Sequence, residues 1–467
     1  MLVLLAGLGV FFAADDQTSV VAVLPKMIEG VGLAQDEFYR AAWIVNAYIL
    51  GYVVAMPLMG RVADVFGHGR VFALSLLVFC LGSAWVALSQ GLTVLSIARA
   101  VQAVGAGALV PVAMAIVTGH ASPQRRAFGL GAMAAAAEAG GLIGPLWGGA
   151  VADLIGWRGV FWINLPMCLP LVVAVWRLSR FEAGAGRRSL DLAGAGLLGG
   201  SLTCLTVALT DDPIEPRRAA VTALLFLAAA ALFGLFLLRQ LRFAEPIVDL
   251  TIFRRLPLSA AFLTNGLVGG VLIVAMVNVP LFTNVVLSGS PLEGGVNLVR
   301  LMVALPVGAL LGGFLAERFG LAAGAVAGLV LAGAGFLGMA AWDEDPSFLL
   351  LTVPLLTAGL GFGFVIAPLN TAVMDVAHEA ERATLASLLT VVRLIGALVG
   401  VALLTTRGLS GFYAEAGLVP LDDPRLAEIL RGLQVDSFQD TFIVTAAVCF
   451  ASVLPALLLG RRRPPSP

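Results

Sequence analysis

Long apolar runs alternate along the sequence with short segments that contain charged residues, proline or glycine. A helix needs about 20 largely apolar residues to cross the hydrocarbon core of a bilayer, and fourteen runs approach or exceed this length. The pattern therefore predicts an all-α membrane protein with fourteen transmembrane helices. Their expected limits are residues 2–25, 41–60, 70–89, 92–118, 127–152, 159–178, 191–210, 219–238, 258–286, 294–316, 321–341, 347–370, 383–406 and 440–460.

An eight-residue segment that follows the second run recurs after the tenth. Residues 60–67 (GRVADVFG) match residues 313–320 (GFLAERFG) at both glycines, the alanine, the acidic residue and the phenylalanine. Two six-helix halves related by an axis along the membrane normal are a known plan of transporters, with the substrate bound near the midplane between the halves. We therefore predict six-helix bundles at residues 1–178 and 258–467, and a linker with two additional transmembrane helices at 179–257.

The distribution of basic residues predicts the orientation, because cytoplasmic loops retain Lys and Arg. With both termini in the cytoplasm, 17 of the 28 Lys and Arg residues fall on the cytoplasmic side and eight on the other. The first run continues through Asp15 and Asp16 to Pro25 and lacks a basic segment before it, so we interpret it as a transmembrane helix and not as a signal peptide. We expect the natural chain to begin earlier than Met1, and we expect a multi-pass protein of the inner (plasma) membrane.

Composition excludes several classes of function. The chain is 60% hydrophobic and 12% charged, and its net charge of −1 with scattered basic residues gives no basis for nucleic-acid binding. The four cysteines lie inside apolar runs without metal-ligand spacing, so we interpret them as buried apolar side chains and predict no metal site. Because the sequence contains neither a zinc-protease motif nor a soluble domain, we expect that the protein is not an enzyme and binds no cofactor. A proton gradient is its expected source of energy.

The recurring segment resembles the loop motif of the major facilitator superfamily, G-x-L-A-D-x-x-G-x-[RK]. Gly60, Asp64 and Gly67 match this motif and Arg70 lies one place late; Glu317 and Arg318 belong to the second copy. The resemblance implies that these residues control the conformational change. From the residues alone, an acid here can cap a neighbouring helix and hold cationic partners, or the charges can serve only as a topology signal.

Three further runs carry motifs of the same family. Residues 16–25 resemble the D-x-T-[IV]-V-N-V-A-L-P signature of the 14-span drug:proton antiporter branch, from which Ser19 and Val21 depart. Arg99 and Gln102 resemble the R-x-x-Q-G-x-G motif, with its glycines displaced. The fifth run is similar to the antiporter motif, in which closely spaced glycines let helices approach and a proline kinks the helix. The motif residues of that run are Gly140, Gly144, Pro145 and Gly148.

Within this branch the chain looks most like actinobacterial permeases that export triacylglycerols and drugs alongside a lipid-carrying lipoprotein. In those relatives an Asp on the first span, a Glu on the fifth and an Arg late in the second half are functionally important, and Asp16, Glu138 and Arg393 match them. The resemblance therefore implies a periplasmic lipoprotein as a partner. The expected outward loop between spans 11 and 12 is shorter than in the relatives, which argues against this partner.

A charge at the bilayer centre costs at least about 2.5–3.5 kcal/mol and needs a partner, a water-filled cavity or a function. Asp16 and Glu138 can pair with arginines when the pathway is closed and bind a proton when it opens, or they can form permanent ion pairs. Arg99 and Arg393 can likewise act in coupling or only in structure. Adjacent helical residues point about 100° apart, so we expect Asp16 to face the pathway in preference to Asp15.

The sequence thus predicts a proton-coupled exporter of drugs or lipids that works by alternating access. Its expected partners are a lipophilic small molecule or lipid, protons and membrane lipids. A nutrient importer or uniporter of the same fold is the alternative, and a membrane sensor is a third hypothesis. Polar contacts in a mainly apolar cavity are expected from Asn46, Gln102, Asn265 and Asn278. In the expected outward loop 407–439, residues 426–433 have helical apolar spacing and form an amphipathic helix or a simple surface loop.

Overall fold

The computed structural model is an assembly of long helices. It describes residues 1–33, 40–120, 123–179, 191–210, 217–243, 246–376, 382–405, 412, 415–416 and 425–459. All regular secondary structure in these ranges is helical, which confirms the all-α prediction. The predicted linker residues 180–190 and most of the loop at 406–424 lie outside the described residues.

Each predicted run corresponds to one long helix, the last run also containing the short α16, and the helices extend beyond the apolar runs by a few residues at many ends. Thirteen helices are long and apolar enough to cross a membrane. The fourteenth, α5, is 33 residues long, but Glu138 and its many glycines lower its mean hydropathy. The bounds are α1 Leu2–Gly30, α2 Ala42–Phe66, α3 His68–Leu88, α4 Leu92–His120, α5 Pro123–Ile155, α6 Trp157–Ser179, α7 Leu192–Leu209, α8 Ala219–Arg242, α9 Leu256–Val285, α10 Pro291–Phe319, α11 Leu321–Met339, α12 Phe348–Val376, α13 Arg382–Gly400, α15 Leu426–Ala451 and α16 Val453–Ala456.

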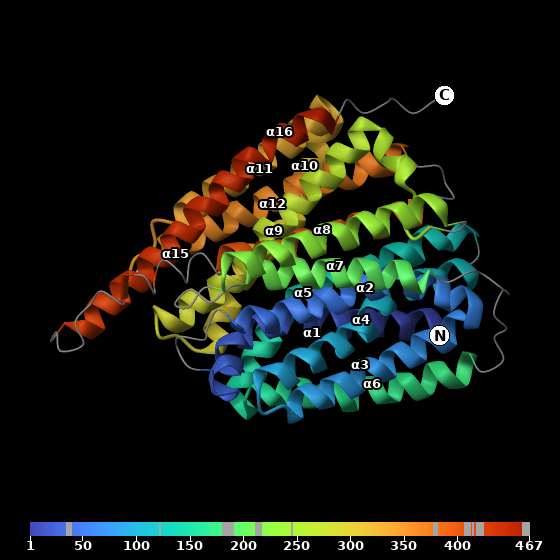
Figure 1. Ribbon diagram of the computed structural model, residues 1–467, viewed down its shortest axis with the longest axis horizontal. Coiled ribbons are helices and arrows are strands. Elements are labelled where there is room, and N and C mark those ends of the chain that lie inside the picture. The colour runs from blue at the N-terminus through green and yellow to red at the C-terminus, as the bar shows by residue number, and fades with distance from the viewer. Residues whose placement is uncertain are drawn as a thin grey trace. The chain divides into compact units, whose positions relative to one another are not determined.

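The helices form two compact units (Figure 1). Unit 1 contains α1–α8, and unit 2 contains α9–α13 and α15. Packing within the units follows the same order: α1 packs mainly on α5 as α9 does on α13, and α3 packs on α4 and α6 as α11 does on α12 and α15. The division of the chain at residues 178 and 257 stays a prediction.

The recurring segment has the same backbone geometry in both units. The amide of Gly67 donates to the Ala63 carbonyl over 2.9 Å, and the amide of Gly320 donates to the Ala316 carbonyl over 3.0 Å. Both glycines have positive φ angles, 96° and 98°, which residues other than glycine rarely adopt. The two copies are therefore equivalent helix–helix corners.

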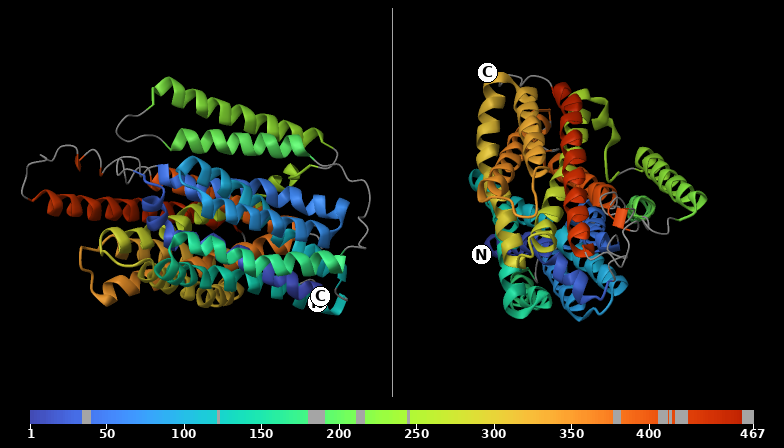
Figure 2. Two further views of the ribbon diagram at one scale, coloured as in Figure 1. Left: turned by 90° about the horizontal axis from the view of Figure 1, so that it is seen from below. Right: turned by 90° about the vertical axis from the view of Figure 1, so that its left-hand side faces the viewer.

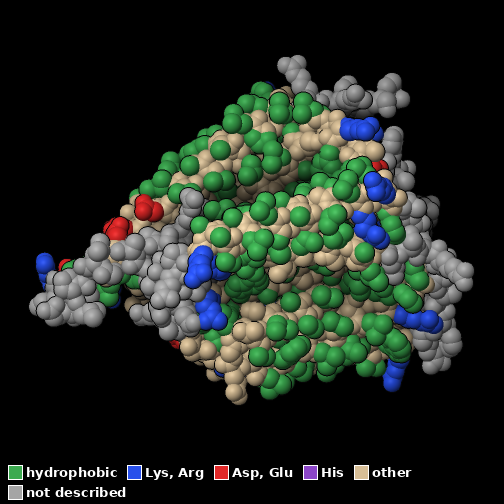
Figure 3. Space-filling model, in the orientation of Figure 1, with side chains coloured by type: hydrophobic (Ala, Val, Ile, Leu, Met, Phe, Trp, Pro, Cys, Tyr) green, Lys and Arg blue, Asp and Glu red, His purple; other side chains and the backbone are tan. Residues whose placement is uncertain are grey.

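The additional helices α7 and α8 lie side by side (Figure 1 and Figure 2), where Ser201 Oγ donates to the Ala229 carbonyl over 2.9 Å. Hydrophobic side chains run along these helices and basic side chains lie near the ends of α8 (Figure 3). Fully buried Asp191, just before α7, accepts hydrogen bonds from Arg239 and Gln240 at the end of α8. Burial acts to raise the pKa of Asp191, but these bonds and one from the Gly194 amide outweigh it and lower the pKa.

The last long helix begins well before the predicted span. α15 starts at Leu426 and continues without a break to Ala451, so the apolar spacing at 426–433 belongs to an extension of that span and not to a separate helix in a loop. Gln439 Nε2 on α15 donates to the carbonyl of buried Trp342 over 2.7 Å. The α11–α12 connection thus anchors the extension.

The four cysteines lie inside helices. Cys80, Cys168 and Cys449 are buried, and Cys204 on α7 is partly buried. All four thiols are free.

Candidate functional site

A buried ion pair joins α1 to α4 in unit 1. Arg99 Nη1 donates to Asp16 Oδ2 over 2.9 Å, and both residues are 1% exposed. The guanidinium of Arg99 lies over the Tyr48 ring of α2 at 4.0 Å and near the Phe161 ring of α6 at 5.7 Å. The arginine is therefore held by one carboxylate and two aromatic faces.

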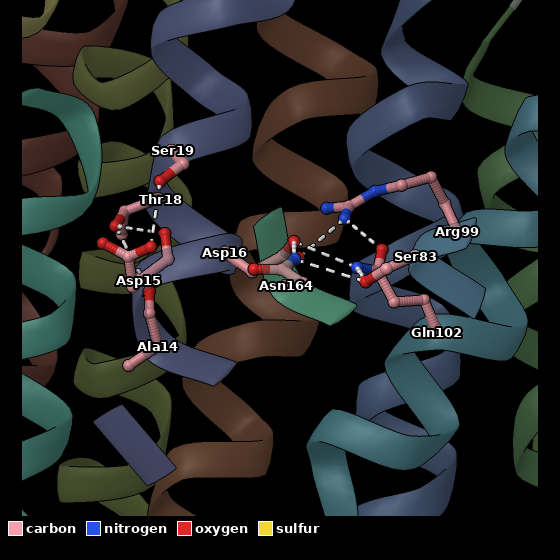
Figure 4. Close-up of polar contacts among 9 residues, drawn as sticks. All are labelled: Ala14, Asp15, Asp16, Thr18, Ser19, Ser83, Arg99, Gln102 and Asn164. Carbon is pink, nitrogen blue, oxygen red and sulfur yellow. Dashed lines mark hydrogen bonds and ion pairs between the residues drawn. The ribbon is translucent and has the colours of Figure 1, made fainter. Parts of the chain in front are cut away.

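Two amide side chains and a hydroxyl complete the buried cluster (Figure 4). Gln102 Nε2 and Asn164 Nδ2 donate to Asp16 Oδ1 over 2.9 and 2.7 Å. Both amides also lie within hydrogen-bonding distance of Ser83 Oγ, at 2.7 and 3.2 Å. Arg99 Nη1 in addition donates to Gln102 Oε1 over 2.6 Å. The cluster joins α1, α3, α4 and α6, and Asp16 is its common acceptor.

The neighbouring acid, Asp15, lies on a different face of α1 (Figure 4). It is 6% exposed, and its Oδ2 is 3.5 Å from Ser19 Oγ. Ser19 Oγ donates to the Gly144 carbonyl of α5 over 2.8 Å. The structure therefore buries both acids, and the expectation that Asp16 faces the pathway in preference to Asp15 stays a prediction.

The glycines of α5 form the surface on which α1 packs. A methyl group at Gly140 would lie 2.3 Å from the Phe11 carbonyl oxygen, and one at Gly148 would lie 2.7 Å from the Ser19 carbonyl oxygen. At Gly144 a methyl group would lie 2.0 Å from Thr18 Oγ1. Pro145 follows inside the same helix. The backbones of α1 and α5 are thus in direct contact along three turns.

The other two charges implied by the resemblance lie outside this cluster. Glu138 on α5 is exposed, and no hydrogen bond or ion pair is formed by its side chain within the described part of unit 1. Arg393 on α13 is half-buried, and its carbonyl abuts Gly269 of α9. Each stands beside the contact of the first and fifth helices of its half. Their pairing stays a prediction.

The acid of the loop motif lies at the start of α3, and its capping role stays a prediction. Gly67 is the N-cap of α3 and has no side chain of its own to cap this end. Asp64 Oδ1 lies 3.0 Å from Nε2 of His68, the first residue of α3. Gly60 lies on α2, one residue before Arg61, which donates to the Pro246 carbonyl. Arg70 lies in the first turn of α3.

The second copy of the motif has its charges at the end of α10. The Arg318 guanidinium lies 5.5 Å from the centre of the Phe319 ring. Glu317 also has an interaction partner. Gly320 is the N-cap of α11, as Gly67 is the N-cap of α3.

The four polar residues expected in the cavity have different surroundings. Gln102 belongs to the buried cluster, Asn265 Nδ2 donates to the Leu389 carbonyl of α13 over 2.6 Å, and Asn278 Nδ2 donates within α9 to Val274. The buried amide of Asn46 has no hydrogen-bond partner in the described residues. The described residues also contain no group of three His, Cys, Asp or Glu side chains that could hold a metal ion.

Sequence reasoning missed Ser83, Asn164 and Tyr48 as members of the cluster. Asn164 could have been found, because it is an amide inside an apolar run and follows the span 5 motif. Ser83 and Tyr48 carry no such signal, since a serine or a tyrosine in an apolar helix commonly bonds to its own backbone or packs as an aromatic.

Comparisons with known proteins agree with this fold. The family model of the Major Facilitator Superfamily matches residues 6–401. A bacterial homologue of the human lysosomal transporter Spinster, solved in an inward-facing, unoccupied conformation, has a TM-score of 0.70 at 18% identity and covers 100% of this chain and 98% of its own. The human organic anion transporter MFSD10 has a TM-score of 0.56 at 18% identity, with 98% and 99% covered.

Two relatives resemble the chain in sequence over nearly its whole length. A triacylglyceride transporter of Mycolicibacterium hassiacum is 34% identical, with 98% of this chain and 91% of the relative covered. A triacylglyceride transporter of Mycobacterium tuberculosis is 32% identical, with 97% and 93% covered. These matches confirm the resemblance drawn from the motifs, and the chain belongs to the major facilitator superfamily of membrane transporters.

Proposed function

We propose that the chain is a proton-coupled exporter of neutral lipids, triacylglycerides above all, that works by alternating access in the inner membrane with both termini cytoplasmic. The buried Asp16–Arg99 pair and its amide partners carry this proposal. A transporter that needed only a path for an apolar molecule would have no use for charges buried in its first bundle.

The cost of burying charge supports a coupling role. A charged side chain at membrane depth costs at least about 2.5–3.5 kcal/mol, and a buried ion pair often contributes little net stability against apolar replacements. The cluster around the pair nevertheless draws on four helices, and Asp16 is adjacent in α1 to the residues that contact the glycines of α5. A cluster at this place can respond to protons and change the contact between helices.

The lipid substrate is supported by the names of the relatives, which are triacylglyceride transporters. An uncharged, bulky substrate also agrees with the composition, in which 60% of residues are hydrophobic. Cationic drugs are the second substrate class, since the span 5 glycine motif resembles that of drug:proton antiporters.

The test is lipid transfer by proteoliposomes with an imposed pH gradient. A fluorescent triacylglyceride reports lipid movement and an enclosed pH dye reports protons. We expect a proton gradient directed opposite to the lipid movement to accelerate lipid efflux. Asp16→Asn and Glu138→Gln should each abolish lipid-linked proton movement. Exposed Glu344, between α11 and α12, provides the control Glu344→Gln, which should behave as the wild type.

A rate of lipid flux that is the same without a pH gradient and with a gradient of either direction would refute proton coupling. Net uptake driven by a gradient of the same direction would support the importer instead. Proton movement linked to a cationic dye, with no lipid movement, would assign drugs as the substrate.

A further inference from the structure

We propose that Asp15, and not the motif residue Asp16, is the carboxyl group that binds and releases the coupled proton, and that the α1–α5 contact closes when Asp15 is protonated. The inference rests on the proposed function and names the proton-binding atom within it. The protonation reaction involves only Asp15 and water: the carboxylate takes a proton from water when α1 and α5 are apart, and returns it when they separate again.

The hydrogen atoms available at Ser19 support this assignment. A serine hydroxyl has one proton to donate and lone pairs to accept with. Ser19 Oγ lies 2.8 Å from the Gly144 carbonyl, which can only accept, and 3.5 Å from Asp15 Oδ2. The shorter bond takes the Ser19 proton. The 3.5 Å contact then gives an ionised Asp15 at most a weak donor, whereas a protonated Asp15 can donate to a lone pair of Ser19 Oγ.

Among the residues whose side chains are described, none that is basic forms an ion pair with Asp15. Arg99 is the basic residue in the middle of the helices packed against α1, and it is committed to Asp16. The other titratable groups of those helices away from their ends are Cys80 on α3, Cys168 on α6 and exposed Glu138 on α5, none of them basic. Among the residues whose side chains are described, the remaining charged residues of α3, α5 and α6 lie near helix ends: His68, Arg70, Asp153, Arg158 and Arg177.

Asp16 is a poorer proton acceptor on geometric grounds. Its two oxygens already receive donors from Arg99, Gln102 and Asn164, so a proton would have to displace one of them. Displacing a donor would also leave Arg99 buried without its carboxylate. Asp16 thus holds the cluster together, while Asp15 Oδ2 has only the Ser19 hydroxyl within hydrogen-bonding distance among the described residues.

The glycine contact links the proton to helix movement. At Gly144 helix α5 lies against the Thr18 hydroxyl and the backbone of α1, and the Asp15 carbonyl oxygen lies only 2.6 Å from the position of a methyl group there. A buried carboxylate without a cation or donor is strongly unfavourable. Loss of the proton therefore requires water at Asp15, and parting of α1 and α5 would let water reach it.

Infrared difference spectroscopy of the purified full-length protein tests the assignment without any substrate. A buried protonated carboxyl gives a C=O stretching band that is separate from the carboxylate bands and disappears on deprotonation. We expect a pH titration of the wild type to show this band, Asp15→Asn to remove it and Asp16→Asn to retain it. Ser19→Ala, which removes the acceptor for protonated Asp15, should move the midpoint of the titration, and Ser201→Ala in α7 should leave it in place.

A band that persists in Asp15→Asn and is lost in Asp16→Asn would overturn the inference. If Asp16→Asn fails to fold, Asp15→Glu decides the matter: a band that neither disappears in Asp15→Asn nor changes frequency in Asp15→Glu also overturns it. In proteoliposomes, lipid-linked proton movement that survives Asp15→Asn refutes the inference alone. Absence of such movement in the wild type refutes the proposed function, while the infrared result still decides whether Asp15 binds a proton.

Discussion

At the scale of single residues, adjacent acids on one helix have different surroundings. Asp16 faces α4 and α6 and receives three donors, whereas Asp15 faces α5 and meets one serine. The difference follows from the helical rotation of about 100° per residue. A charged residue inside an apolar run was enough to select Asp16 and Arg99 from the sequence. Their contact with each other, and the participation of Asn164 in the cluster, could not be predicted because they depend on the packing of helices that are distant in the chain.

The Asp16–Arg99 pair should show strong energetic coupling. Removing one partner leaves the other charge buried, so we expect Arg99→Gln or Asp16→Asn alone to lower the free energy of unfolding by about 3–5 kcal/mol. The double variant should lose much less stability than the sum of the losses in the two single variants. Chemical unfolding in detergent micelles measures this cycle, with exposed Arg431 on α15 giving the control Arg431→Gln. Additive losses would show that the pair is not a unit.

At the scale of helices, the contact between α1 and α5 depends on which glycines of α5 face α1. Gly144 touches Thr18 and Asp15, but at Gly141 the nearest atom to a methyl group would be 4.0 Å away. The sequence predicted this stripe from its spacing of four residues. It could not predict the partner helix, because a glycine stripe specifies close approach and not the helix that approaches.

Substitution of the two glycines should therefore have opposite outcomes. Gly144→Ala must push α1 away or displace Thr18, and we expect it to cost about 1–3 kcal/mol and to impair transport. Gly141→Ala fills ordinary space and, as a better helix former, should be neutral or slightly stabilising. Thermal unfolding and lipid efflux measure both variants. Equal effects would show that the contact is not as close as described.

At the scale of the whole molecule, the two units repeat one plan. Gly67 and Gly320 occupy equivalent corners with φ angles of 96° and 98°. The internal repeat was visible in the sequence because both corners need glycine at the same offset from the alanine. The length of α15 was not visible, since polar residues at 431–440 interrupt the apolar pattern although the helix continues through them.

Equivalent corners should respond equally. Replacing a glycine in such a backbone conformation costs of order 1–3 kcal/mol, so we expect Gly67→Ala and Gly320→Ala to lower stability by similar amounts. Gly313→Ala, inside α10 with open space around it, is the control and should be tolerated. Thermal unfolding compares the three variants. A large effect at one corner only would contradict the equivalence of the repeats.

The placement of the native thiols has a practical consequence for chemical labelling. With Cys80, Cys168 and Cys449 buried and Cys204 partly buried inside the apolar helix α7, a membrane-impermeant maleimide has no readily reached target among them. A single cysteine introduced by Glu344→Cys would then react selectively without prior removal of the native ones. Its labelling in intact cells would report directly which side of the bilayer the α11–α12 connection faces, and with it the sidedness of both ends of the chain.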